Sequence, residues 1–271
     1  MDVNEFQDLL YEIDDKGILT VTLNNPERKN ALSALTLLEL WYALEHAEKD
    51  KAVKAMILTG SKEADAFCSG GYFSMNIFKN IPEEARKEVD ISDMASKKLA
   101  LKFWNFTKPI IAAVNGLGVG AGFTIPVICA DLAYASEEAW FGLYFIKRAV
   151  IGDFGSTFFL PLLIGFKKAK ELFYFGDKIT AQQAKTLDLI NEVVPADELM
   201  AYAKEQALRL IPPKGPSLAL NSMKKSIHTY YGEILEKQLD VENEYWNRCV
   251  KSKDFRESLA ALKEKREPNF K

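Results

Sequence analysis

The sequence predicts an α/β fold, and two observations lead to this prediction. Apolar, β-branched runs alternate with stretches of helical spacing across residues 1–196, a pattern typical of α/β cores. From about residue 197 the β-branched runs disappear, and the chain becomes helical and charged as far as residue 271. We therefore expect a core formed by residues 1–196 and a C-terminal helical region, 197–271, that cannot form a large core by itself.

The periodicity assigns each element in turn. Strands are expected at about 9–14, 18–24, 54–59, 109–114, 131–135 and 191–195. Helices are expected in the core at about 34–48, 86–105, 122–129, 158–164, 167–175 and 181–187, and after it at 197–210, 216–230, 232–250 and 254–264. In the first helix, Thr36 and Glu39 have the spacing of a capping box. The stripe of that helix expected to face the core comprises Leu37, Leu40, Trp41 and Leu44.

Composition indicates an ordinary soluble enzyme. With 271 residues, of which 48% are hydrophobic, the chain can bury a sizeable core. The net charge of −3 gives no electrostatic argument for a nucleic-acid or membrane partner. No apolar run is long enough to span a membrane, and the N-terminus lacks the pattern of a signal peptide, so we expect a cytoplasmic protein. The three cysteines include no C-x-x-C pair, so neither a disulfide framework nor a metal site is expected.

Two glycine-rich turns are the most informative local features. One follows the apolar run 108–114 and places glycines at 116, 118, 120 and 122, after which helical spacing begins. The other, at 69–71, follows the apolar run 55–60. Backbone N–H groups at such a turn can hold an anion, either a phosphate or a developing oxyanion. The glycine spacing matches neither the dinucleotide fingerprint nor the P-loop, which makes a nucleotide phosphate the weaker interpretation.

Five segments together resemble the crotonase, or enoyl-CoA hydratase/isomerase, superfamily. They are Leu23-Asn-Asn-Pro-Glu-Arg-Lys-Asn-Ala-Leu32, Phe67-Cys-Ser-Gly-Gly71, Lys108-Pro-Ile-Ile-Ala-Ala-Val-Asn-Gly116, Asp131-Leu-Ala-Tyr-Ala135 and Gly176-Asp-Lys-Ile-Thr-Ala-Gln-Gln-Ala184. The resemblance implies a ββα spiral core whose C-terminal helices form homotrimers or dimers of trimers. It also implies an acyl-CoA substrate and no separate cofactor, because coenzyme A enters as part of the substrate.

The resemblance assigns an oxyanion hole to two backbone amides, those of Gly71 and Ala121. Enolising a thioester places negative charge on its carbonyl oxygen, and pre-aimed N–H donors stabilise that charge without reorganising. Small residues at Gly70 and Gly122 would let the thioester approach, although glycines in tight turns also serve packing alone.

Other residues are expected to contact the substrate. Arg28 and Lys29 occupy a loop that the family uses to hold coenzyme A, although exposed basic residues are more often only solvated. At the C-terminus the matching residues are Lys265, Arg266, Phe270 and Lys271. The expected pocket contacts are Ala31, Cys68, Gly70, Tyr72, Gly122, Thr124, Tyr144 and Phe145. Cys68 is interpreted as a small packed residue in preference to a nucleophile.

The acid/base residues depart from the hydratase pattern. Hydratases of the family use two glutamates, and here those places hold Thr124 and Phe145, neither of which can take a proton. Two-glutamate hydration is therefore not expected. Asp153 occupies a third position, where enoyl-CoA and dienoyl-CoA isomerases carry a catalytic carboxylate and a dehalogenase carries a nucleophilic one. Alternatively, Asp153 caps a helix that starts near 154–156.

Three functions remain open from the sequence. The first is double-bond isomerisation with Asp153 as acid and base. The second is another reaction on the same scaffold, such as single-acid hydration, decarboxylation or hydrolysis. The third is a non-catalytic acyl-CoA-binding subunit. Aromatic residues such as Tyr72, Tyr144 and Phe145 favour a bulky or cyclic acyl group. Tyr144 is either a hydrogen-bond donor to the substrate or a half-buried residue at a subunit contact.

Overall fold

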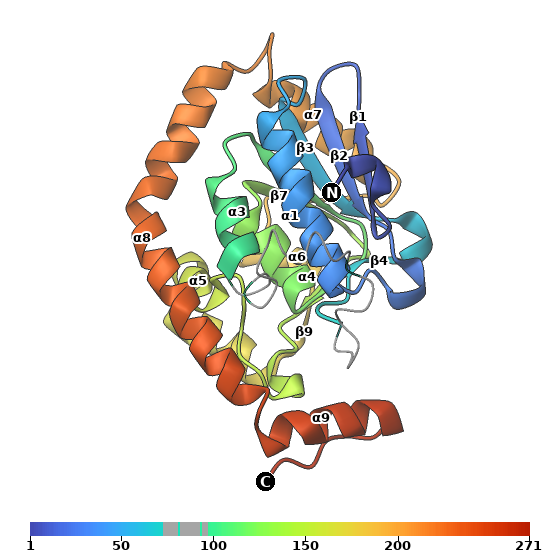
Figure 1. Cartoon of the computed structure of the whole chain (residues 1–271), viewed down its shortest axis with the longest axis vertical. Coiled ribbons are helices and arrows are strands. Elements are labelled where there is room, and N and C mark those ends of the chain that lie inside the picture. The colour runs from blue at the N-terminus through green and yellow to red at the C-terminus, as the bar shows by residue number, and fades with distance from the viewer. Residues whose placement is uncertain (73–80, 82–92, 94–96) are drawn as a thin grey trace.

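The computed structural model describes residues 1–72, 81, 93 and 97–271, and it contains two sheets covered by helices (Figure 1). The larger sheet has six strands in the order β1-β2-β3-β5-β7-β10. These strands are Leu9–Ile13, Ile18–Leu23, Ala55–Gly60, Ile110–Val114, Leu132–Ser136 and Glu192–Val194. Only the β1–β2 pair is antiparallel among these strands. All six strands predicted from the sequence are confirmed within one or two residues, as is the α/β fold class.

The centre of the larger sheet is fully buried. Every residue of β3 and of β5 is buried, as expected for parallel strands that have helices on both faces. Leu58 packs in the main hydrophobic cluster, which includes Leu38 and Leu44 of α1 (Ala34–Lys49). Its neighbour Ile57 packs on the opposite face, in a second cluster that includes Leu199. Alternate residues of one strand thus contact two different helical layers.

The smaller sheet has four strands in the order β4-β6-β8-β9, and none of them was predicted from the sequence. They are Ala66–Cys68, Leu117–Val119, Trp140–Gly142 and Lys178–Thr180, each of three residues. The first three are parallel neighbours, and β9 pairs antiparallel with β8. Strands this short have no measurable alternation, and two of them contain glycine, so periodicity alone does not find them.

Helix α1 begins differently from the sequence prediction. Its N-cap is Ser33, which forms a reciprocal capping box with Thr36, so the predicted box between Thr36 and Glu39 is wrong. The buried carboxylate of Glu39 instead accepts hydrogen bonds from the amides of Gln7 and Asp8, at 2.8 and 2.9 Å. Glu39 therefore ties the N-terminal segment to the helix.

The remaining core helices mostly match the expected ranges. They are α3 (Leu99–Asn105), α4 (Ala121–Thr124), which continues into a π-helical turn at Ile125–Cys129, α5 (Ser156–Phe175) and α6 (Ala181–Thr186). The two helices predicted at 158–164 and 167–175 lie within α5, whose helical backbone is interrupted between them at Gly165, with φ 77° and ψ 155°. Most of the predicted segment 86–98 lies outside the described residues.

The C-terminal helices take three forms. Helix α7 (Leu199–Leu210) packs against the larger sheet through Leu199, Ala203 and Ala207. Helix α8 (Ser217–Cys249) is one continuous helix, so the expected division into helices at 216–230 and 232–250 is wrong, and it runs along the outside of the molecule past α3 and α5 (Figure 1). Helix α9 (Lys253–Glu264) lies at the end where the chain terminates.

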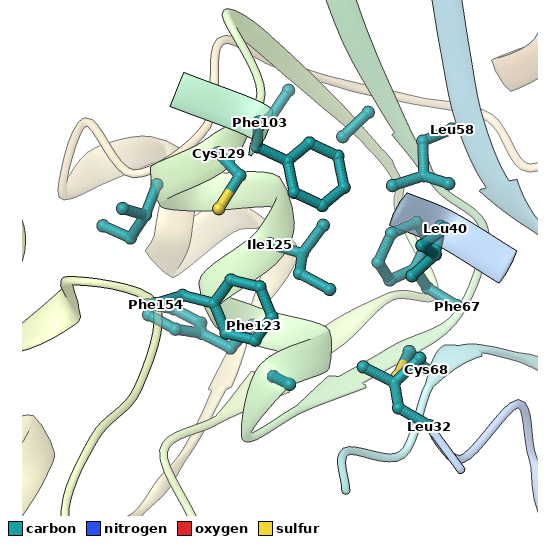
Figure 2. Close-up of a cluster of buried hydrophobic side chains, with 14 of the residues drawn as sticks. Leu32, Leu40, Leu58, Phe67, Cys68, Phe103, Phe123, Ile125, Cys129 and Phe154 are labelled. Atoms are coloured by element: carbon teal, nitrogen blue, oxygen red, sulfur yellow. The ribbon is translucent and has the colours of Figure 1, made fainter. Parts of the chain in front are cut away.

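The main hydrophobic cluster joins the larger sheet to the smaller one. In Figure 2, Leu40 and Phe67 lie on one side, and Phe123 and Ile125 of the α4 segment lie opposite them. Phe67 and Phe123 are both completely buried. Among the described residues, no helix has the length and apolarity needed to cross a membrane. Nor do the described His, Cys, Asp and Glu side chains form a group of three suited to a metal ion.

Candidate active site

The first glycine turn directs the amide of Gly71 away from its neighbouring strand. Leu32 donates its N–H to the Gly70 oxygen at 2.8 Å and accepts from the Tyr72 amide at 2.9 Å, which makes Gly71 the centre of a parallel bridge. In this pattern the residues on either side of Gly71 take up the hydrogen bonds to Leu32. Within the described part of the chain, the Gly71 amide has no acceptor, and the residue is exposed.

The second glycine turn meets the first at very short range. A Cβ on Gly70, whose φ is 93°, would lie 2.8 Å from the Val119 oxygen and 3.8 Å from the Gly120 Cα. A Cβ on Gly122 would lie 2.0 Å from the Cys68 oxygen, so only glycine allows this approach. The residues that follow Gly70 and Gly120 are Gly71 and Ala121. The two proposed amide donors are thereby brought together, one on each turn.

The amide of Ala121 is available because of where its helix begins. Gly120 is the N-cap of α4 and Ala121 is the first helical residue, a position whose N–H has no partner inside the helix. Phe123 and Thr124 donate to the Gly120 oxygen, whereas Ala121 finds no acceptor among the described residues. The helix N-terminus adds a partial positive charge at the same point.

The side chain of Cys68 contacts the glycine turn, and its contact with substrate stays a prediction. Its side chain is completely buried, and its Sγ accepts a hydrogen bond from the Gly70 amide at 3.3 Å. Burial raises the pKa of the Cys68 thiol to about 12, so the group is not a nucleophile at neutral pH. Its role is to hold the glycine turn.

Asp153, the candidate acid, is hydrogen-bonded by the residue that occupies a hydratase glutamate's place. Thr124 is completely buried, and its Oγ1 donates to Asp153 Oδ1 at 2.8 Å. Its direct contact with substrate stays a prediction. Because Thr124 lies on α4 one turn after Ala121, a single short helix connects the amide donor to the acid. The pKa of Asp153 is raised to about 7, chiefly by burial. The hydrogen bond from Thr124 acts to lower this pKa, and the charge of Glu242 acts to raise it.

Asp153 does not cap the helix that comes after it, so this alternative is wrong. The N-cap of α5 is Gly155, and the cap has no side-chain hydrogen bond from its own residue. The N-terminal amides of α5 are instead bound by Glu242 of α8, at 2.8 Å to Gly155 and 2.9 Å to Thr157. Glu242 was not predicted from the sequence, because it lies far from Asp153 along the chain, in a helix with no local signal of a site.

Aromatic side chains lie beside the second turn. Phe145 occupies the place of the other hydratase glutamate, and its ring is 3.8 Å from where a Cβ on Gly120 would stand. It is buried, so this wall of the site is apolar. Tyr144 packs over Gly142, and the ammonium group of Lys147 lies 4.1 Å from its ring centre. That packing holds Tyr144 at the edge of the smaller sheet.

The loop at 28–30 lies against the first turn. Arg28 stacks on Tyr72, with 4.3 Å between the guanidinium carbon and the ring centre. Ser69 donates its amide to the Lys29 oxygen at 3.0 Å and its hydroxyl to the Arg28 oxygen at 3.0 Å. Ala31 is buried behind the loop. The structure therefore places Arg28 and Lys29 beside the first turn, and their contact with coenzyme A stays a prediction.

The C-terminal residues are not brought to the turns within the described single chain. Phe270 and Lys271 are exposed beyond α9, and the Lys271 amide donates to Asp254 at 3.3 Å. Lys265 and Arg266 lie at the end of the same helix, where Arg266 pairs with Glu257. Their contact with coenzyme A remains a prediction.

Comparison with known proteins decides the family. The family model for enoyl-CoA hydratase/isomerase matches residues 14–271. The chain belongs to the enoyl-CoA hydratase/isomerase family. It is 32% identical to an Escherichia coli 1,2-epoxyphenylacetyl-CoA isomerase over 94% of this chain and 95% of that protein. It is equally 32% identical to a short-chain-enoyl-CoA hydratase of Clostridium acetobutylicum, over 97% of each chain.

Solved structures of this enoyl-CoA hydratase/isomerase family have the same fold. An enoyl-CoA hydratase/isomerase from Pseudoalteromonas atlantica superimposes with a TM-score of 0.84 at 26% identity, covering 98% of this chain and 100% of the other. An enoyl-CoA hydratase from Mycobacterium avium subsp. paratuberculosis also gives 0.84 at 26% identity, over 98% and 99%. The crotonase resemblance is thus confirmed, and the chain is an enzyme of the hydratase or isomerase type that acts on acyl-CoA.

Proposed function

We propose that this enzyme moves the double bond of an enoyl-CoA, with Asp153 as the acid and base and the amides of Gly71 and Ala121 as the oxyanion hole. The hydrogen bond from Thr124 to Asp153 is the observation that carries the proposal. It joins the residue in a hydratase glutamate's place to a carboxyl group that can serve instead. Phe145, in the other glutamate's place, offers no proton acceptor.

The proposed reaction needs one group that both takes and returns a proton. Ionised Asp153 removes a proton from the carbon next to the thioester, and the electron pair moves to the carbonyl oxygen as the enolate forms. The amides of Gly71 and Ala121 stabilise that oxygen. Protonated Asp153 then returns the proton at the γ carbon, which shifts the double bond and restores the thioester. A pKa of about 7 suits both steps near neutral pH.

The relatives support both a hydratase and an isomerase, so the site must distinguish them. The Escherichia coli relative is named an isomerase, and the Clostridium acetobutylicum relative is named a hydratase. A paired-glutamate hydration is disfavoured by the buried Thr124 and Phe145. Phe145 beside Gly120 also favours an apolar, bulky acyl group.

We also propose a homotrimer or a dimer of trimers, as the family resemblance implies. Helix α8 exposes large apolar side chains that a subunit contact would cover. Those at least 42% exposed are Leu218, Met223, Ile227, Tyr230, Ile234, Val241 and Tyr245. The trimer, like the cytoplasmic location, stays a prediction.

The test is an assay of linear and cyclic 2-enoyl-, 3-enoyl- and dienoyl-CoA thioesters, with products identified by mass and chromatography. Isomerisation gives a product of unchanged mass, whereas hydration adds one water. Asp153→Asn keeps the size of the side chain but cannot accept a proton at neutral pH, so turnover should fall by roughly 10² to 10⁴. The exposed Asp177→Asn provides the matched control.

In deuterium oxide the wild type should exchange label at the α or γ carbon, and Asp153→Asn should not. Wild-type turnover and exchange in Asp153→Asn would refute the mechanism. Binding of every thioester without any turnover by the wild type would instead support a non-catalytic subunit.

A further inference from the structure

Glu242 connects the C-terminal helical region to the turn that bears Asp153. It lies on α8 and is almost completely buried, with 2% of its surface exposed. Its Oε2 accepts from the Gly155 amide at 2.8 Å, and its Oε1 accepts from the Thr157 amide at 2.9 Å and the Thr157 hydroxyl at 2.5 Å. Gln238, one helical turn earlier, donates to the same hydroxyl at 3.0 Å. Both carboxylate oxygens are therefore engaged with the start of α5.

The turn that Glu242 binds has an uncommon backbone. Phe154 and Gly155 both have positive φ, 54° and 76°, and for a bulky residue such as Phe154 this conformation is disfavoured. Such a turn persists only when its surroundings impose it. Because α5 has no cap from its own N-cap residue, Glu242 supplies the acceptors that its first amides need. The residue immediately before this turn is Asp153.

Glu242 also acts on Asp153 through its charge. The described titratable groups that face Asp153 are Glu242 on α8, the Cys68 thiol on β4 and the Cys129 thiol after α4. Burial raises the pKa of both thiols, so they are neutral near pH 7. Glu242 is therefore the one carboxylate among these neighbours, and its charge raises the pKa of Asp153. Burial raises the pKa of Glu242 itself, while the hydrogen bonds it accepts lower it.

We propose that Glu242 is a positioning residue for Asp153, fixing the turn at 153–155 so that the Asp153 carboxyl is aimed at the substrate. The inference rests on the proposed role of Asp153. It assigns part of the catalytic geometry to the C-terminal region, which is also proposed to form subunit contacts. Thr124 then holds Asp153 from α4, while Glu242 holds it from α8 through the backbone.

The decisive variant is Glu242→Gln, with Glu244→Gln as the matched control. Glutamine has one oxygen and one amide nitrogen, so it can satisfy one of the two backbone amides but not both. Glu244 lies on the same helix with its side chain 66% exposed. Displacing Asp153 should reduce kcat by roughly 10- to 100-fold while KM changes by less than about twofold. Glu244→Gln should match the wild type in both constants.

The kcat of the folded variant separates positioning from simple capping, and the pH profile reports the charge of Glu242. Removing the Glu242 charge lowers the pKa of Asp153, so the acid limb of kcat/KM should move to lower pH in Glu242→Gln. A residue that only stabilised α5 would lower the melting temperature and leave kcat of the folded variant at the wild-type value. A wild-type kcat in folded Glu242→Gln would overturn the inference.

Thr157→Val provides the second variant if Glu242→Gln does not fold. It removes the hydroxyl from the Glu242 carboxylate and keeps the charge, so kcat should fall by about 2- to 10-fold at constant KM, without movement of the acid limb. Wild-type kcat in Thr157→Val would then overturn the inference. Failure of the proposed function is recognised separately, because Asp153→Asn would in that case retain full turnover.

Discussion

The six-stranded and the four-stranded sheets differ in strand length, in burial and in the segments that come after their strands. In the larger sheet, every residue of β3 and β5 is buried, and their side chains pack in a hydrophobic cluster on each face of the sheet. In the smaller sheet every strand has three residues. After β4 come Gly70 and Gly71, after β6 comes Ala121, and after β8 come Tyr144 and Phe145. The site is built almost entirely at the ends of the smaller sheet.

The difference indicates that stability and chemistry depend on separate kinds of interaction. The larger sheet is stabilised by burying apolar side chains, which tolerates conservative exchange. The smaller sheet depends on backbone approaching backbone, as where Gly122 faces the Cys68 oxygen, and there a single added methyl group has no room. Mutations in the two sheets should therefore have different effects, on folding in one case and on turnover in the other.

The largest effect on stability is expected in the larger sheet. Ile57 is fully buried against α7, on the face of β3 away from Leu58 and the glycine turns. Ile57→Ala should lower the free energy of unfolding by roughly 2–5 kcal/mol, measured by denaturant titration. The folded variant should retain wild-type kcat and KM. A large loss of kcat at unchanged stability would contradict the separation of the two sheets.

A comparable effect, on the barrier and not on folding, is expected at Ala121. Proline is well tolerated at the first position of a helix and removes the N–H, so Ala121→Pro deletes the proposed donor. Loss of one such donor should raise the barrier by roughly 2.7–4 kcal/mol, seen as a drop of about 10² to 10³ in kcat. Lys253→Pro, at the first position of the exposed start of α9, serves as the control. Equal kcat in the two folded variants would show that the Ala121 amide is not part of the oxyanion hole.

The same contrast explains which features the sequence could predict. Runs such as 55–60 and 110–114 have composition and length that periodicity detects, so the larger sheet and most helices were found. The glycine turns were found from their glycines and the apolar runs before them, and the family resemblance assigned the amides of Gly71 and Ala121 to an oxyanion hole. The contacts of Thr124 and Glu242 could not be predicted from the sequence. Their hydrogen bonds to Asp153 and to the start of α5 join segments far apart in sequence, and no local pattern encodes such a contact.

A third effect, which depends on pH, links the site back to stability. The pKa of Asp153 is about 7 in the folded chain, against 3.8 for an ordinary aspartate, so between these values the folded state binds more protons than the unfolded state. Its contribution to stability therefore decreases as pH rises from about 4 to 7. Asparagine does not titrate, so Asp153→Asn does not lose stability in this way. The unfolding free energy of Asp153→Asn minus that of the wild type should therefore increase from about pH 4 to 7.

The gain should be at most roughly 4 kcal/mol, because one pKa unit corresponds to about 1.4 kcal/mol. It should level off above pH 7 and can be followed by urea titrations at several pH values. Glu39, whose pKa burial also raises to about 7, is present in both proteins and cancels in the difference. A difference that does not change with pH would show that Asp153 titrates normally in the folded chain.

The smallest effect is expected at the rim of the smaller sheet, where Arg28 lies over the exposed ring of Tyr72. An exposed cation–π contact is worth about 0.5–1 kcal/mol. Arg28→Ala removes this contact and also the positive charge that is proposed to bind the coenzyme A phosphates. KM for an acyl-CoA should rise by roughly 2- to 5-fold with kcat unchanged. Arg28→Lys keeps the charge but not the planar stacking, so its KM should lie between those of the wild type and Arg28→Ala. Raising the salt concentration should narrow the gap between wild type and Arg28→Ala, since screening weakens an exposed charge. A fall in kcat at unchanged KM would contradict this prediction and show that Arg28 stabilises the transition state.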